Sequence, residues 1–278
     1  MFELNYISPN GGVLRLADNP DFVLSGVDGM TETSIDISSS DVPYSDGDTI
    51  NSMRAQPREM VLYFTIKQGR NVESVKRAVL SVIKPKQSGT LLWKQNGREL
   101  AIVGAVESVS MPRFTDNVTM QISLYCSDPF WNDAQYIVNQ IDLIIKKHYY
   151  AVTFPMGSGI VMGQYDFQLT RSFENVGDVA VGLEITIIAT GAVNNPKLER
   201  SDGLFFGVAE TMVAGDTIKI STIKGKKTVT KNGVNIMPKV IPGSTWLQLE
   251  VGENVFTISS DEAKPEMYFV FEYKQKYV

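Results

Sequence analysis

The spacing of apolar residues limits the possible folds of this chain more than any other feature. Apolar and polar side chains alternate over residues 59–67, which is the period of a strand with one buried face. Valines then recur every three or four residues over 72–82, which is the period of an amphipathic helix. Asn71 can cap the start of this helix, and residues 84–85 (Lys-Pro) end it. We therefore expect a half-buried strand followed by one short helix that packs against a sheet.

Two Asn-Gly pairs mark tight turns between strands. Asn96-Gly97 joins two apolar segments in the first half of the chain, and Asn232-Gly233 lies within a second strand pair. The Asn-Gly dipeptide readily adopts the positive φ angles that a two-residue hairpin turn requires. We predict a hairpin at each position.

The strand predicted at residues 120–126 is followed by a stop signal, Asp-Pro-Phe-Trp at 128–131. The two aromatic side chains could dock against a partner or close the core of a first domain. We favour core closure, because large aromatic side chains are mostly buried in the protein that carries them. Cys126 is the only cysteine, which excludes an intrachain disulfide, and we expect it to pack in the core.

The second half of the chain repeats the strand pattern without a clear helix. Short strands separated by turn signals are predicted at residues 181–188, 204–208, 217–222, 228–230, 246–250, 255–258 and 267–273. Parallel strands would need intervening helices, so this order favours an antiparallel β-sandwich. Residues 132–167 fit either a helix or an extended connection, and we favour the extended one because β-branched residues are frequent there.

Length and composition indicate a folded protein with two domains. The 278 residues are enough for two cores, and 43% hydrophobic with 21% charged residues is typical of globular proteins. A net charge of -5 gives no basis for specific nucleic-acid binding, although DNA could still pass at a distance. The first residues lack a secretory signal and no apolar run is long enough to span a bilayer. We expect synthesis in a cytoplasm, no secretion and no membrane partner.

No complete set of catalytic, metal-binding or cofactor-binding residues can be assembled from the sequence. The single histidine, His148, has no metal ligands at suitable spacing, and there is no Gly-x-Ser-x-Gly elbow. Residues 157–159 (Gly-Ser-Gly) and the lysine cluster at 224–227 each lack a glycine that phosphate-binding loops need. The carboxylates at 261–262 are adjacent, so on a strand they would point in opposite directions. We expect no enzyme activity and no cofactor.

Two surface features remain as candidate binding sites. Residues 38–57 are rich in Ser and Asp, and we expect a long loop there; loops of that length are often functional. We predict that this loop contacts another copy of the chain or a partner through Asp41, Tyr44, Asp46 and Arg54. Trp246 is a candidate for saccharide or partner contact, although the alternation around it leaves its side of the sheet ambiguous.

Several segments occur in the same order as in a known family. In the first half these are Arg58 before an alternating strand, Arg77 in the helix, a strand pair, and residues 126–131 (Cys-Ser-Asp-Pro-Phe-Trp). In the second half they are residues 173–178, 215–220, 231–235, 246–249 and 252–254. This ordered set resembles the siphophage tail-component family, which includes the distal tail proteins. The resemblance covers nearly the whole chain except the connector at 132–167.

The resemblance implies a mainly β fold in two parts. Residues 1–133 would be a ring-forming β-barrel or split-barrel-like domain with a helix near 71–83. Residues 134–278 would be a linker and a galectin-like antiparallel β-sandwich, similar to a carbohydrate-binding module, that projects outward from the ring.

It also implies a structural function: a homohexameric hub ring at the distal end of a long non-contractile tail, in the virion. Such a ring joins the tail tube protein to the tail-tip protein and anchors baseplate and receptor-binding proteins. The alternative is a module that binds host-wall saccharides through the sandwich.

Overall fold

The computed structural model describes residues 2–42, 44, 46–110, 118–141, 170–262 and 266–278. Over these residues the chain is mainly β, with one α-helix and one short 3-10 helix. It divides into two compact units, which we treat separately. Unit 1 comprises Met1–Ala134 and Lys276–Val278, and unit 2 comprises Gln135–Gln275. The last three residues therefore return to unit 1, whereas the sequence had suggested a second domain that continues to residue 278.

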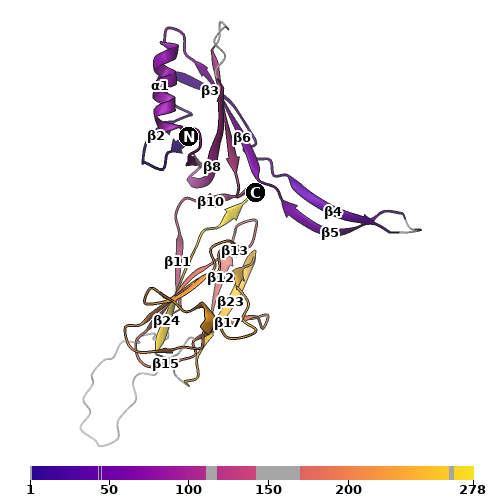
Figure 1. Ribbon diagram of the computed structural model, residues 1–278, viewed down its shortest axis with the longest axis vertical. Coiled ribbons are helices and arrows are strands. Elements are labelled where there is room, and N and C mark those ends of the chain that lie inside the picture. Colours follow the sequence, from indigo (N-terminus) through magenta and orange to yellow (C-terminus); the bar gives the residue numbers. More distant parts are fainter. Residues whose placement is uncertain (1, 43, 45, 111–117, 142–169, 263–265) are drawn as a thin grey trace, which may run out of the picture. The chain divides into compact units, whose positions relative to one another are not determined.

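Unit 1 is built on a nine-stranded antiparallel sheet with the order β2-β1-β7-β8-β9-β6-β3, to which β10 and β25 add at one side (Figure 1). Its strands are β1 (Glu3–Ile7), β2 (Val13–Arg15), β3 (Phe22–Asp28), β6 (Arg58–Ile66), β7 (Ser88–Gln95), β8 (Arg98–Ser110), β9 (Thr119–Cys126), β10 (Trp131–Asp133) and β25 (Lys276–Tyr277). The described strands run from an end at β2 to an end at β3, so the sheet is open and not a closed barrel.

The predicted amphipathic helix is α1 (Val72–Val82), which lies along one side of the unit 1 sheet (Figure 1). Its start is capped as expected, because the side chain of Asn71 accepts the backbone N–H groups of Glu73 and Ser74 at 3.0 and 3.1 Å. Val75 and Val79 are buried on its inner face. The helical period of the valines thus corresponds to the face that packs on the sheet.

The core of unit 1 follows the strand alternation. In β6, Met60, Leu62 and Phe64 are fully buried, while the residues between them are partly exposed. Trp131 is also buried, and its ring packs edge-on against that of Trp93 at 5.6 Å. The interpretation of residues 128–131 as core closure is therefore confirmed for Trp131.

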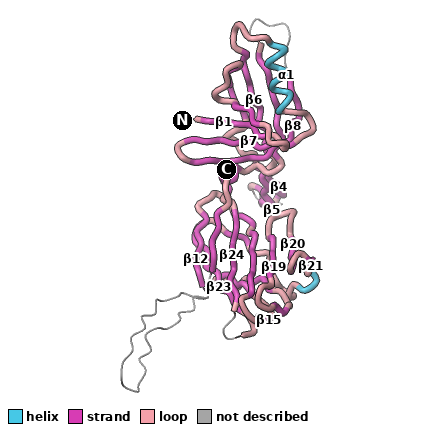
Figure 2. Tube along the Cα trace, turned by 90° about the vertical axis from the view of Figure 1, so that its left-hand side faces the viewer, coloured by secondary structure: helices cyan, strands magenta, loops and turns pink. Residues whose placement is uncertain are grey.

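Unit 2 contains the predicted antiparallel sandwich (Figure 2). One sheet has six strands in the order β11-β24-β14-β19-β20-β21, and the other has four in the order β12-β23-β16-β17. The strands of unit 2 are β11 (Ile137–Ile141), β12 (Thr170–Asn175), β13 (Val181–Gly182), β14 (Glu184–Ala189), β15 (Val193–Asn194), β16 (Lys197–Arg200), β17 (Phe205–Gly207), β18 (Thr211–Met212), β19 (Thr217–Ser221), β20 (Thr228–Lys231), β21 (Val234–Asn235), β22 (Gln248–Leu249), β23 (Gly252–Ser259) and β24 (Met267–Tyr273). Met237–Lys239 is the 3-10 helix.

Aromatic side chains from both sheets meet in the core of unit 2. Phe271 on β24 lies 5.0 Å from Phe173 on β12 and 5.8 Å from Phe256 on β23, measured between ring centroids. All three are buried. Since β24 belongs to the six-stranded sheet and the other two strands to the four-stranded sheet, these rings connect the layers of the sandwich.

Both predicted Asn-Gly turns are confirmed. Asn96 and Gly97 connect β7 to β8 with φ angles of 52° and 81°, and Asn232 and Gly233 connect β20 to β21 with 49° and 83°. A turn with two consecutive positive φ angles favours Asn followed by Gly, because these residues adopt positive φ angles more readily than others. The extended connection favoured for 132–167 is confirmed in β11, and residues 142–169 lie outside the described part of the chain.

The prediction of a long loop at residues 38–57 was wrong. This segment forms most of a hairpin of two long strands, β4 (Ile35–Asp41) and β5 (Asp48–Ala55). Ser and Asp residues are unusual in strands, and they suggested a loop. A bulge in β5 also shifts the spacing of its apolar residues, so the alternation could not be recognised.

Replacing Phe271 by Ala should lower the free energy of unfolding of unit 2 by about 3–5 kcal/mol, because it removes a buried ring that joins both sheets. Denaturant unfolding of the full chain, followed by hydrogen exchange to distinguish the two units, would measure this loss. The exposed Val251→Ala variant of the same unit should change the value by less than about 0.5 kcal/mol. A loss below about 1 kcal/mol for Phe271→Ala would contradict the layered core.

Candidate interaction surface

The β4–β5 hairpin is the most exposed regular structure in the described part of unit 1. Every residue of β4 is exposed, and in β5 only Ala55 is partly covered. The two strands pair only with each other, as a separate two-stranded sheet that extends away from the nine-stranded sheet (Figure 1). A two-stranded hairpin alone is only marginally stable in water, so contacts with another surface would stabilise it.

One face of this hairpin is apolar near its base. Directly paired residues point to the same face, and the pairs Ile35 with Ala55, Ile37 with Met53 and Ser39 with Ile50 alternate along it. The four larger side chains form what we call the apolar stripe: Ile35, Ile37, Ile50 and Met53, with exposed fractions of 56%, 55%, 55% and 66%.

A β-bulge keeps the stripe in phase. The pairing shifts between Ser38 and Ser39, where Asn51 of β5 has no directly paired residue in β4. Ile50 and Met53 are three positions apart, so in a regular strand without a bulge they would point to opposite faces. The bulge therefore places the fourth apolar side chain beside the other three.

The opposite face of the hairpin is polar. Its directly paired residues are Asp36 with Arg54, Ser38 with Ser52, and Ser40 with Thr49. The hairpin is thus amphipathic although it has no core of its own to cover. Four large apolar side chains aligned on one exposed face are typical of a protein–protein contact.

The residues predicted for a partner contact all lie on this hairpin, but in different places. Asp41 ends β4, and Tyr44 and Asp46 belong to the turn, where Tyr44 is fully exposed with a φ angle of 63°. Arg54 lies on the polar face. The sequence analysis did not identify the apolar stripe. The signal that could have revealed it is the pairing of Ile35 with Ala55 and of Ile37 with Met53. Whether these residues touch a partner stays a prediction.

Trp246, the candidate for saccharide contact, is half-buried in unit 2. Its ring packs against Phe206 at 4.9 Å between centroids, and the ammonium group of Lys227 lies 5.3 Å from the Trp246 centroid. The lysine cluster at 224–227 thus supplies a cation to this ring. Saccharide binding at Trp246 stays a prediction, and this packing gives it no added support.

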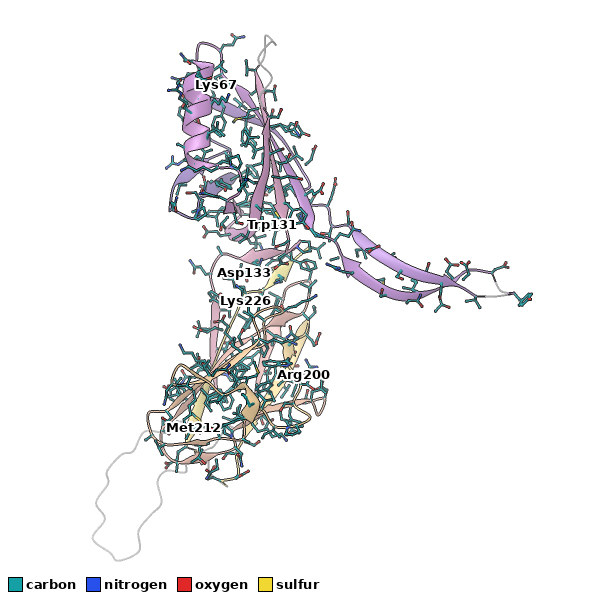
Figure 3. All side chains as sticks on the ribbon, in the orientation of Figure 1. Lys67, Trp131, Asp133, Arg200, Met212 and Lys226 are labelled. Atoms are coloured by element: carbon teal, nitrogen blue, oxygen red, sulfur yellow. The ribbon has the colours of Figure 1, made fainter. Side chains whose placement is uncertain are left out.

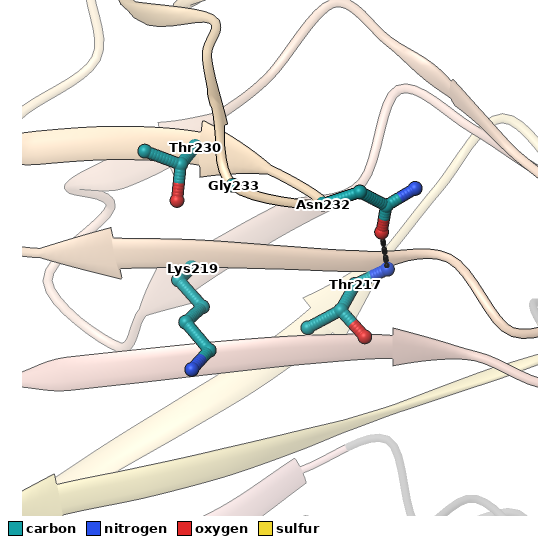
Figure 4. Close-up of a pocket in the computed structure, with 5 residues that line it drawn as sticks. All are labelled: Thr217, Lys219, Thr230, Asn232 and Gly233. Atoms are coloured by element: carbon teal, nitrogen blue, oxygen red, sulfur yellow. Dashed lines mark hydrogen bonds between the residues drawn. The ribbon is translucent and has the colours of Figure 1, made fainter.

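A small open pocket lies on the outer side of β19 and β20 (Figure 4). It is lined by Thr217, Lys219, Thr230, Asn232 and Gly233, and the backbone N–H of Thr217 donates to the side-chain oxygen of Asn232 at 2.9 Å. This lining offers polar groups but no aromatic ring and no carboxylate. We assign no ligand to it.

The titratable groups of unit 2 with shifted pKa values stabilise turns and strands. The ammonium group of Lys231 lies 3.1 Å from a carboxylate oxygen of Glu210 and 3.1 Å from one of Asp216, and Lys239 also pairs with Glu210. The backbone N–H of Val213, together with Asn232 and Lys231, lowers the pKa of Asp216 to about 2. Hydrogen bonds from Lys239 and Lys231 lower the pKa of Glu210.

The other groups singled out by the sequence are also structural where they are described. The carboxylate of Glu262 accepts the backbone N–H of Asn194 at 3.0 Å, and that of Asp261 accepts the side-chain amide of Asn195 at 2.6 Å. Burial raises the pKa of the Cys126 thiol to about 11, which keeps it protonated and unreactive. His148 and residues 157–159 lie outside the described residues. Within the described ranges, no three His, Cys, Asp or Glu side chains are grouped to hold a metal ion.

No helix in the described part of the chain is long and apolar enough to cross a membrane.

Comparisons with known proteins agree with this arrangement. Residues 10–126 match the family model described as phage tail protein RIFT-related domain, and residues 176–277 match the C-terminal domain of the siphovirus-type tail component. Together these matches cover most of the chain. No curated protein matches the sequence.

The fold is shared with solved phage proteins. The crystal structure of Dit from phage SPP1, described as a paradigm of the hub adsorption apparatus in phages that infect Gram-positive bacteria, aligns over 100% of both chains with a TM-score of 0.71 and 14% identity. A chain of the phage P2 baseplate in its activated conformation with Ca aligns over 99% of this chain and 98% of that one, with a TM-score of 0.50 and 10% identity.

The two family matches identify a structural protein of a siphovirus-type tail, located in the virion tail and not an enzyme. The chain belongs to the distal tail protein family of siphovirus-type tail components.

The lowered pKa of Asp216 predicts a loss of stability in acid. The pKa of the Asp216 carboxyl is about 2 in the folded chain, compared with 3.8 for an ordinary aspartate. The ionised carboxylate therefore stabilises the fold above pH 3.8, and this stabilisation is lost as the pH falls toward 2. The melting temperature of unit 2 should fall more steeply between pH 4.5 and about pH 2.5 in the wild-type chain than in Asp216→Asn. Glu253→Gln, at an exposed position of β23, serves as the control and should follow the wild-type curve. Parallel curves for the wild type and Asp216→Asn would contradict the assignment.

Proposed function

We propose that this chain forms a homohexameric ring at the distal end of a long non-contractile tail. In this ring it joins the tail tube protein to the tail-tip protein and anchors baseplate and receptor-binding proteins. DNA passes through the ring without specific recognition, and the chain is made in the host cytoplasm before assembly. The hub described for the similar SPP1 protein supports this proposal.

The observation that carries the proposal is the apolar stripe. The stripe belongs to a hairpin that lies outside the core of unit 1. Every side chain of β4 in this hairpin is exposed. A contact between this hairpin and a different surface of the next copy is heterologous, and heterologous contacts close into rings when the rotation between copies is suitable. The hairpin then gains the cover that a two-stranded sheet needs.

The predicted contact residues fit this arrangement in a specific way. The apolar stripe supplies area that is removed from water, at roughly 25 cal/mol per Å² of apolar surface. Arg54 and Asp36 on the polar face, with Asp41 at the end of β4, can remain in the hydrated rim of the same contact. We therefore propose that the stripe provides most of the binding free energy and that the charged residues select the partner.

Ile37→Asp should abolish or strongly weaken ring formation, because it introduces a charge into the middle of the apolar stripe. Ser38→Asp is the matched control, since it adds the same charge to the neighbouring residue on the polar face. Mass measurement in solution and negative-stain imaging, with and without purified tube and tip proteins, would count the rings. Both variants should retain the wild-type melting temperature within a few degrees, as the hairpin contributes no buried side chain to the core.

Two outcomes would count against the proposal, and they can be told apart. Equal ring formation by Ile37→Asp and the wild type would show that rings form without the stripe. A wild-type chain that stays monomeric and binds neither tube nor tip protein would refute the hub ring itself.

A further inference from the structure

The β4–β5 hairpin is the continuation of a longer ribbon that is interrupted at its base. Strand β3 pairs with β6, and the same two chain segments then pair again as β4 and β5. The interruption is unequal, with residues 29–34 on one strand and only residues 56–57 on the other. We call residues 29–34 and 56–58 the hairpin root. Because more residues separate the paired strands on one side than on the other, the ribbon changes direction at the root. Contacts made by the root residues must therefore fix the new direction of the hairpin.

Arg58, the first residue of β6, binds this root through its guanidinium group. Its Nε donates to the carbonyl oxygen of Pro129 at 2.6 Å, and Nη1 donates to those of Gly29 at 3.2 Å and Met30 at 2.6 Å. Its Nη2 donates to the hydroxyl oxygen of Thr33 at 2.8 Å. The side chain of Arg58 starts on the returning strand β6. It thus binds both residues 29–33, which leave the sheet, and Pro129, which lies just before β10.

The environment of this guanidinium is unusual for a structural arginine. Arg58 is only 3% exposed, and the four acceptors just named are three carbonyl groups and a hydroxyl, none of them charged. A buried cation is tolerated only where acceptors surround it with good geometry. The position of residues 29–33 is therefore tied to the planar donor pattern of the arginine.

Two neighbouring contacts hold the same segment in register. The indole Nε1 of Trp131, labelled in Figure 3, donates to the carbonyl oxygen of Met30 at 3.0 Å, so that this oxygen receives both donors. Gly29 has a φ angle of 74°, and a Cβ atom there would collide with the carbonyl oxygen of Glu59. Residues 29–30 can thus pass β6 only along one path.

We infer that Arg58 is a positioning residue, which sets the direction in which the β4–β5 hairpin leaves unit 1. Its consequence for assembly, the placement of the apolar stripe against the next subunit, rests on the ring proposed above. Lysine would keep the charge but could not replace all four hydrogen bonds, since it has only three donors and they leave from a single nitrogen.

Hydrogen exchange on the full chain, read by mass spectrometry, tests this inference without requiring a ring. Arg58→Lys should raise exchange in the root and in β4 and β5 by about tenfold, while β7 and β8 keep wild-type protection. Thr33→Val removes only the hydroxyl acceptor and should raise exchange in the same segments by about threefold. Thr33→Ser keeps that acceptor and is the matched control. Ring formation should fall in the order of these exchange effects.

Each outcome decides the inference. Exchange in the root and hairpin that stays at the wild-type level in both Arg58→Lys and Thr33→Val overturns it, even if rings form. If Arg58→Lys loosens the whole of unit 1, the Thr33 pair decides: a local increase in Thr33→Val that is absent from Thr33→Ser supports the inference, and no increase overturns it. Failure of the wild-type chain to form rings would refute the proposed function but leave this exchange result intact.

Discussion

A two-stranded ribbon cannot bury an apolar face by itself, and this constraint relates the fold of the chain to its work in the tail. Unit 1 satisfies the constraint by covering its sheet with α1, and unit 2 satisfies it by packing two sheets together. The β4–β5 hairpin does neither, although its apolar stripe is kept in phase by a bulge. The part of the chain that lacks cover within the described structure is thus the part best suited to contact another molecule.

The titratable side chains among the described residues have structural roles. In unit 2 the titratable side chains with shifted pKa values stabilise turns and strands, such as Asp216, whose carboxylate accepts the backbone N–H of Val213. The buried thiol of Cys126 and the buried guanidinium of Arg58 lie within unit 1 and serve its packing and its connection to the hairpin. These groups therefore stabilise the two units and the base of the hairpin.

The sequence was sufficient where one local rule acted alone. The valines of α1, the alternation of β6 and the two Asn-Gly turns follow directly from helical period, strand period and φ preference. It was insufficient for the hairpin, because serines and aspartates concealed a strand pair whose register depends on one bulged residue, Asn51. The function of Arg58 was also hidden, since its acceptors come from residues 29–33 and 129, which approach it only in the folded chain.

Unit 2 shows the same limit at Trp246. Alternation could not decide its side of the sheet, and in the structure the ring is placed by contacts with Phe206 and Lys227 from other segments. Contacts between segments distant in sequence decide such positions, and local patterns do not report them.

A cryo-electron microscopy map of the assembled tail end would test the central claim most directly. The account predicts six copies of this chain in a closed ring, with Ile37 and Met53 of each hairpin covered by the adjacent copy. A map in which the chain forms no ring, or in which the apolar face of the hairpin remains open to solvent in the complete tail, would contradict it.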